Sequence, residues 1–154
     1  MLTNTDETAG SRNLEGRVLF IYPHGPDRTL YVSALREAGF EVGAEATVTD
    51  ATALLHTGDT PDAIVMELLP EPIEAWAFIE RQCADAPGVP LIILTSLIRP
   101  DRAHRRRART LGCAAFVAKP CSLRQLVDVV ARVRRGSRGL EISTYEAPRT
   151  GDIR

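Results

Sequence analysis

The sequence has 154 residues, a formal net charge of −1, 44% hydrophobic residues and 25% charged residues, which is typical of one soluble globular domain. A charge this close to zero provides no field that would attract nucleic acid or an anionic membrane. No apolar run approaches the roughly 18 residues of a membrane span, and the polar segment 1–15 lacks the hydrophobic stretch of a signal peptide. We therefore expect a cytoplasmic protein.

Apolar clusters alternate in length and period along the chain. Short runs rich in branched and aromatic residues predict five strands, at 17–22, 40–46, 63–68, 90–95 and 114–118. A segment with helical spacing follows each run, at 26–39, from Asp50, at 72–86, at 100–111 and from Ser122. Five repeats of strand then helix predict a parallel sheet with helices on both faces and right-handed crossovers.

Single residues predict where the helices begin and which faces they bury. Pro26 and Gly39 suit the first turn and the end of the first helix, and Asp50 is expected to cap the second. Ser122 and Gln125 predict a capping box on the last helix. The residues expected to face the core are Leu30, Ala34, Leu35 and Ala38, then Ile73, Trp76, Ala77 and Ile79, then Leu126, Val127, Val130 and Val133.

The ends of the chain differ in composition from its centre. Residues 1–15 and 136–154 show no sustained apolar period, so we expect two flexible tails around one domain at 16–135. The three cysteines lack C-x-x-C spacing and the three histidines lie far apart in the sequence. We therefore expect separate thiols, with neither a disulfide nor a zinc site.

Polar residues follow several of the predicted strands. Tyr22 and Pro23 follow the first strand, Glu67 ends the third, Thr95 ends the fourth and Lys119 follows the fifth. The carboxyl ends of parallel strands meet at one edge of a doubly wound sheet, where ligands bind. This edge is therefore the expected site.

Four short motifs occur in order along the chain. They are Ala38-Gly-Phe40, Pro61-Asp62, Ile92-Ile-Leu-Thr95 and Leu111-Gly-Cys-Ala-Ala-Phe-Val-Ala-Lys-Pro120. With these motifs, residues 17–135 resemble the response-regulator receiver domain family of two-component signalling. The resemblance implies a doubly wound, five-stranded parallel sheet with flanking helices, of the flavodoxin-like receiver type.

The resemblance also implies roles for individual residues. Glu67 occupies the place of the aspartate that accepts phosphate, and Thr95 and Lys119 match the residues that bind the phosphoryl oxygens. The acidic pair that holds Mg²⁺ falls on Tyr22 and Pro23. The switch aromatic of the family falls on Phe116.

Two of these matches depart from the family pattern. Glu67 is one methylene longer than aspartate, which moves its carboxylate by about 1.5 Å, and the interval from Glu67 to Pro70 is one residue shorter than usual. Tyr22 and Pro23 supply no carboxylate for Mg²⁺. We therefore expect an atypical receiver without metal, cofactor or enzymatic activity, in which Glu67 contacts Lys119.

The helix predicted at 100–111 is rich in arginine. In the receiver family this helix commonly contacts partners, so Arg102, Arg105, Arg106 and Arg109 predict a partner surface. The expected partner is a signalling protein, such as a histidine kinase or an output protein, and a homodimer remains open. Two alternatives also remain open: phosphotransfer through Glu67 or a displaced Asp27, and a nucleic-acid-binding regulator. Nucleic acid is not expected, because the chain has few aromatic residues beside these arginines and no helix-turn-helix segment.

Overall fold

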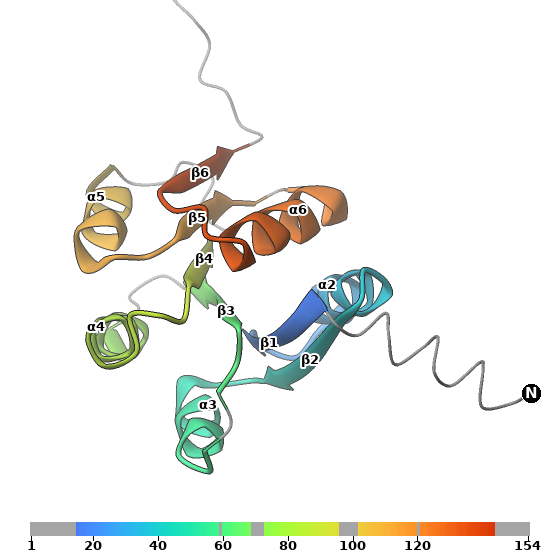
Figure 1. Cartoon of the computed structure of the whole chain (residues 1–154), viewed down its shortest axis with the longest axis horizontal. Helices are drawn as coiled ribbons and strands as arrows, with labels where there is room; N and C mark the ends of the chain where they lie inside the picture. Colours follow the sequence, from blue (N-terminus) through green and yellow to red (C-terminus); the bar gives the residue numbers. More distant parts are fainter. Residues whose placement is uncertain (1–14, 59, 69–72, 96–101, 120, 144–154) are drawn as a thin grey trace, which may run out of the picture.

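The computed structural model describes residues 15–58, 60–68, 73–95, 102–119 and 121–143. One parallel sheet forms the centre of this part of the chain (Figure 1). Its strands are β1 (Gly16–Ile21), β2 (Phe40–Glu45), β3 (Ala63–Leu68), β4 (Leu91–Thr95), β5 (Ala115–Ala118) and β6 (Leu140–Ser143). They lie in the order β2-β1-β3-β4-β5-β6, and every neighbouring pair is parallel.

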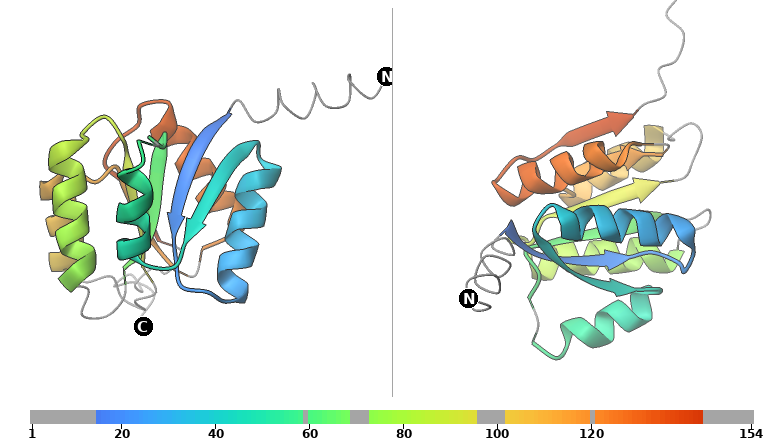
Figure 2. Two further views of the ribbon diagram at one scale, coloured as in Figure 1. Left: turned by 90° about the horizontal axis from the view of Figure 1, so that it is seen from below. Right: turned by 90° about the vertical axis from the view of Figure 1, so that its right-hand side faces the viewer.

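Helices cover both faces of the sheet (Figures 1 and 2). They are α2 (Pro26–Glu37), α3 (Val48–Leu55), α4 (Ile73–Asp85), α5 (Arg102–Leu111) and α6 (Leu123–Arg134). Helices α2 and α6 pack on one face, and α3, α4 and α5 on the other. Side chains alternate along each strand, so Val65 faces α2 and α6 whereas Ile64 and Met66 face α3, α4 and α5. The predicted parallel α/β architecture is confirmed.

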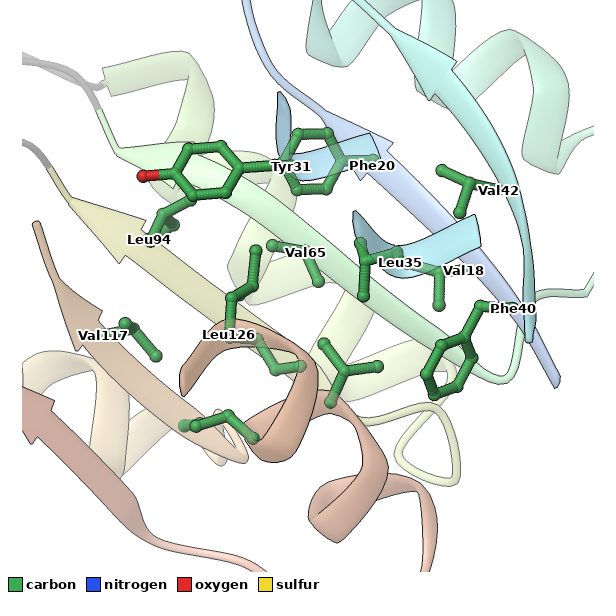
Figure 3. Packing of buried hydrophobic residues seen from close by; sticks show 14 of the residues in the cluster. Val18, Phe20, Tyr31, Leu35, Phe40, Val42, Val65, Leu94, Val117 and Leu126 are labelled. Carbon is green, nitrogen blue, oxygen red and sulfur yellow. The ribbon is translucent and has the colours of Figure 1, made fainter. Parts of the chain in front are cut away.

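The α2/α6 side of the core is lined by aromatic and branched side chains. Figure 3 shows side chains of this layer, with Phe20 from β1, Tyr31 and Leu35 from α2, and Leu126 from α6. Strands β1, β3 and β4 are buried almost throughout, as expected for central strands covered on both faces. Among the described residues, no helix is long and apolar enough to cross a membrane.

Strand β6 corrects the prediction of five strands. It lies in the segment 136–154 that was expected to be a flexible tail, and it pairs with β5 at the edge of the sheet. Gly136 and Gly139, with φ of 115° and 71°, turn the chain from the end of α6 into this strand. The strand has only four residues, too few to produce a period in the sequence. The βαβ connection from β5 through α6 nevertheless places it in the sheet.

The predicted buried faces of three helices were correct in part: Leu35, Trp76, Ile79, Leu126, Val130 and Val133 are buried as expected, and other predicted residues are not. In α2, Leu30 is 55% exposed and Ala38 is exposed, whereas Tyr31, Val32 and Leu35 are buried. In α4, Ile73 is 80% exposed and Ala77 is exposed, while Trp76, Phe78 and Ile79 are buried. In α6, Val127 is half-buried, and Val129 joins Leu126, Val130 and Val133 in the core. Apolar residues point in several directions around these helices, and only the side that packs against the sheet is buried.

The helix caps confirm one prediction and correct another. Ser122 Oγ accepts a hydrogen bond from the Gln125 backbone N–H at 3.0 Å, and Gln125 Oε1 accepts one from the Ser122 N–H at 2.8 Å, which is the predicted capping box. Helix α3 is capped by Thr47 rather than Asp50. The Thr47 hydroxyl accepts a hydrogen bond from the Asp50 N–H at 3.1 Å, so Asp50 lies inside the first turn, where its charge suits the helix dipole.

Candidate functional site

Three polar side chains from three strand ends meet at the carboxyl edge of the sheet. Tyr22 follows β1, Glu67 is the penultimate residue of β3, and Lys119 follows β5. Backbone hydrogen bonds continue the ladder here: the Tyr22 N–H donates to the Glu45 carbonyl at 2.9 Å, and the Lys119 N–H donates to the Thr95 carbonyl at 2.7 Å. Glu67 follows the alternation of Val65, and Lys119 that of Val117, so both side chains lie on the α2/α6 face with Tyr22.

Lys119 is the centre of the cluster. Its Nζ lies 3.0 Å from Glu67 Oε1 and donates a hydrogen bond to the Tyr22 hydroxyl. The predicted Glu67–Lys119 contact is therefore confirmed. The Glu67 side chain is 5% exposed and that of Lys119 is 14% exposed, so this ion pair is shielded from water. Glu67 Oε1 is buried, and the Lys119 ammonium 3.0 Å away supplies the positive charge beside it.

The site holds Lys119 charged and Tyr22 neutral. Burial lowers the pKa of Lys119, but the hydrogen bond to Tyr22 and the negative charge of Glu67 outweigh it, so its pKa is raised above the ordinary value. Burial raises the pKa of Tyr22, and Glu67 adds to this, while Lys119 opposes it only in part. At neutral pH the cluster contains an ammonium that donates to a neutral phenol.

Aromatic neighbours hold Tyr22 in place. Its ring stacks on Phe20, with centroids 5.4 Å apart, and meets Tyr31 of α2 edge-on at 5.8 Å. Tyr31 and Cys121 belong to the same side of the core, where Cys121 packs against the cluster that contains Tyr31, and burial raises the pKa of the Cys121 thiol. Sequence analysis missed Tyr31 and Cys121 as neighbours of the site. Phe20 and Tyr22 are two residues apart on a strand and therefore share a face, so their stacking could have been predicted from the sequence. The contact with Tyr31 could not, because Tyr31 was not on the predicted buried face of α2.

The other predicted site residues lie around this cluster. Thr95 is fully buried at the end of β4, where the sheet register pairs it with Leu68 rather than with Glu67. Pro23 is exposed, and Asp27 lies exposed in the first turn of α2. Phe116 is 4% exposed and packs in the core on the α3/α4/α5 side. Lys119 itself forms an ion pair with Glu67 and hydrogen bonds with the Tyr22 hydroxyl and the Thr95 carbonyl.

The arginines of α5 divide between internal contacts and solvent. Arg109 forms an ion pair with Glu141 of β6, and the guanidinium of Arg107 lies 4.5 Å above the ring of Trp76. The ring of Trp76 also stacks on the ring of His104, with centroids 5.9 Å apart, and this contact connects α4 to α5. Of the predicted surface, Arg102 and Arg106 are exposed and Arg105 is half-buried.

Comparison with known proteins supports the receiver resemblance. The receiver domain of a Francisella response regulator superposes with a TM-score of 0.68 at 18% identity, covering 78% of this chain and 97% of that domain. The chain has the fold of a response-regulator receiver domain. No protein-family model matches the sequence.

Curated relatives of this receiver-type chain include response regulators. It is 30% identical over 122 residues to the response regulator protein VraR of Staphylococcus aureus, across 78% of this chain and 57% of that protein. It is also 33% identical over 98 residues to protein-glutamate methylesterase/protein-glutamine glutaminase 2 of Anaeromyxobacter dehalogenans, across 64% of this chain and 28% of that protein. The chain thus matches 57% and 28% of the lengths of these two relatives.

Proposed function

We propose that this chain is an atypical receiver module of two-component signalling, which acts by binding a protein partner and does not depend on aspartyl phosphorylation. The observation that carries the proposal is the position of Lys119, whose ammonium lies 3.0 Å from the Glu67 carboxylate and donates to Tyr22. A carboxylate of the chain itself thereby supplies the negative charge that a phosphoryl group would present to this lysine.

The charge balance of the site supports this proposal. Breaking a buried ion pair from one side costs roughly 3–5 kcal/mol, because it leaves an uncompensated charge. A phosphoryl group entering the site would have to compete with Glu67 for Lys119, or to modify Glu67 itself. The ion pair therefore favours a single conformational state, without a phosphate-driven population shift.

The residues present do not fit the magnesium ion that the receiver family implies. Mg²⁺ requires near-octahedral oxygen ligands and normally more than one carboxylate in a site of this kind. Here the phenol of Tyr22 accepts from an ammonium, Pro23 has no side-chain ligand, and the Glu67 carboxylate is already paired with Lys119. A cation fixed 3.0 Å from that carboxylate repels a dication. No step of the proposed function involves a metal.

The output of such a module is a contact rather than a reaction. The exposed Arg102 and Arg106, with Arg105 and Arg109 beside them, offer positive charge on α5. A complementary acidic surface on a kinase, an output protein or a second copy of the chain would be recognised by charge, with binding that weakens as salt rises. We therefore place the partner surface on α5.

Phosphorylation assays test this function. The full chain is incubated with acetyl phosphate and Mg²⁺, and its intact mass is measured beside that of a receiver with a complete acidic site. We expect no mass increase for this chain and an acid-labile phosphate on the control. Stoichiometric acid-labile phosphate on this chain would contradict the proposal. Glu67→Gln and Asp27→Asn would then show which carboxylate accepts it.

A further inference from the structure

The two edges of the sheet differ in how their backbone groups are covered. Strands β2 and β6 are the outermost strands, at opposite ends of the strand order (Figure 1). An edge strand directs the N–H and C=O of every second residue away from the sheet, where another chain can pair with them. The hydrogen-bond partners of these outward groups therefore show whether an edge is closed or open.

Side chains of α2 occupy the outward carbonyls of β2. The Glu45 carbonyl accepts a hydrogen bond from the residue after β1, so the backbone alternation directs Val42 and Ala44 outward. The guanidinium of Arg36 donates to the Val42 carbonyl at 3.0 Å, and that of Arg28 donates to the Ala44 carbonyl at 3.5 Å. A strand that approached this edge would have to displace both arginines.

The outward groups of β6 are open. The Leu140 N–H donates to the Ala114 carbonyl at 3.1 Å, so Leu140 faces β5. The backbone alternation then directs Glu141 and Ser143 outward. No described residue forms a hydrogen bond with the outward N–H and C=O groups of these two residues. Each of them therefore offers one donor and one acceptor at this edge.

The charge that could protect this edge is neutralised. Charged side chains on an edge strand discourage pairing with another strand. Glu141 is the charged residue of β6, and its carboxylate forms an ion pair with Arg109 of α5. The edge therefore presents a neutral pair of side chains rather than an isolated negative charge.

We propose that two copies of this chain form a twofold dimer by antiparallel pairing of β6 with β6, which joins the two sheets into one. In the proposed register, Glu141 lies opposite Ser143 of the second copy, and Ser143 lies opposite its Glu141. Opposed residues of this kind exchange both N–H···O bonds, so every outward group of the strand finds a partner. A second copy fits this edge because a twofold axis presents the edge with its own complement.

Charge and strand length favour this register over its neighbours. Sliding one strand by two residues places Glu141 directly opposite Glu141 of the second copy, and like charges in that arrangement are destabilising. Sliding it the other way places Glu141 opposite residue 145, which lies beyond the end of β6. The proposed register alone pairs both outward residues of each strand with outward residues of the other strand.

Molecular mass and amide exchange test the dimer. Sedimentation equilibrium of the full chain should give twice the 16.9 kDa mass of one copy, and NMR should show the Glu141 and Ser143 amides protected from exchange. A monomer at the concentration used for NMR would overturn the proposal. A dimer with rapidly exchanging amides at these positions would place the contact elsewhere and overturn it too. Protection in a monomer would have the same meaning, because residues after Ser143 would then cover the edge themselves.

Proline substitutions separate the two edges of the sheet. Glu141→Pro removes an outward N–H but keeps the hydrogen bonds to β5, so we expect the mass to fall by half to that of a folded monomer. Ala44→Pro makes the same change at the outward edge of β2 and should remain dimeric. Glu141→Gln removes the ion pair but keeps the N–H, and it should also remain dimeric. A dimeric Glu141→Pro, or a folded monomer of either control, would overturn the proposal.

A second proline variant protects the test against misfolding. If circular dichroism shows that Glu141→Pro does not fold, Ser143→Pro removes the other outward N–H at the last residue of β6. We expect this variant to be a folded monomer as well. A dimeric Ser143→Pro would overturn the proposal, because the pairing of the two strands requires that N–H.

Discussion

Two ion pairs of this protein connect distant parts of the chain in different environments. Glu67 and Lys119 join β3 to the end of β5, with side chains 5% and 14% exposed. Arg109 and Glu141 join α5 to β6, with side chains 67% and 32% exposed. Water screens the second pair and hardly reaches the first. The same type of contact is therefore expected to carry very different energies, depending on burial.

Removing one partner of the buried pair should have the largest effect. Lys119→Met leaves the Glu67 carboxylate buried beside Tyr22 without a counter-charge, and we expect a loss of roughly 3–5 kcal/mol in the free energy of unfolding. Urea denaturation followed by Trp76 fluorescence measures this. The double variant Glu67→Met/Lys119→Met is the control and should recover most of the loss, because it leaves no charge unpaired. A single variant as stable as the parent would show that water reaches the pair.

Removing the phenol oxygen should have the next largest effect. Tyr22→Phe keeps the stack on Phe20 but deprives the Lys119 ammonium of its acceptor, and hydrogen bonds to charged groups contribute about 1.5–3 kcal/mol. Equilibrium unfolding of Tyr22→Phe gives the value. Tyr31→Phe, whose ring packs against Tyr22, is a matched control for loss of a buried hydroxyl. An equal loss in both variants would mean that the bond to Lys119 has no special weight.

Alkaline pH should weaken the same cluster more gradually. The pKa values of Lys119 and Tyr22 are both raised in the folded protein, so their contribution to stability is complete below the ordinary values of 10.5 and 10.0. It is lost as the pH rises through the raised values. Lys119 is the only lysine in the sequence, so lysine-selective ¹³C labelling reports its titration without overlap. A midpoint below 10.5 in the folded protein would contradict the charge arrangement described above.

The exposed pair should have the smallest effect. Arg109→Gln or Glu141→Gln is expected to change the free energy of unfolding by about 0–1 kcal/mol, and the change should shrink further in high salt. A double-mutant cycle on Arg109 and Glu141, run beside the cycle on Glu67 and Lys119, compares the two coupling energies directly. If the exposed pair coupled as strongly as the buried pair, burial would not be the deciding factor.

The sequence predicted which residues gather at the candidate site. Glu67, Thr95 and Lys119 end or follow predicted strands, and the carboxyl ends of parallel strands meet at one edge, so their gathering followed from the order of elements. The role of Tyr22 was not predictable in the same way. The sequence showed only that Tyr22 stands where a carboxylate was expected, whereas its hydrogen bond from Lys119 depends on the stack of Phe20, Tyr22 and Tyr31.

The sequence by itself determined the elements whose signals are local. The branched run of β4, the proline at the start of α2 and the capping box of Ser122 and Gln125 act through neighbouring residues, so they can be recognised without knowing the fold. Tertiary structure alone decided which phase of α2 is buried, that β6 joins the sheet, and that Lys119 donates a hydrogen bond to Tyr22. Each of these depends on packing between segments far apart in the chain, and that packing is set by the register and twist of the whole sheet.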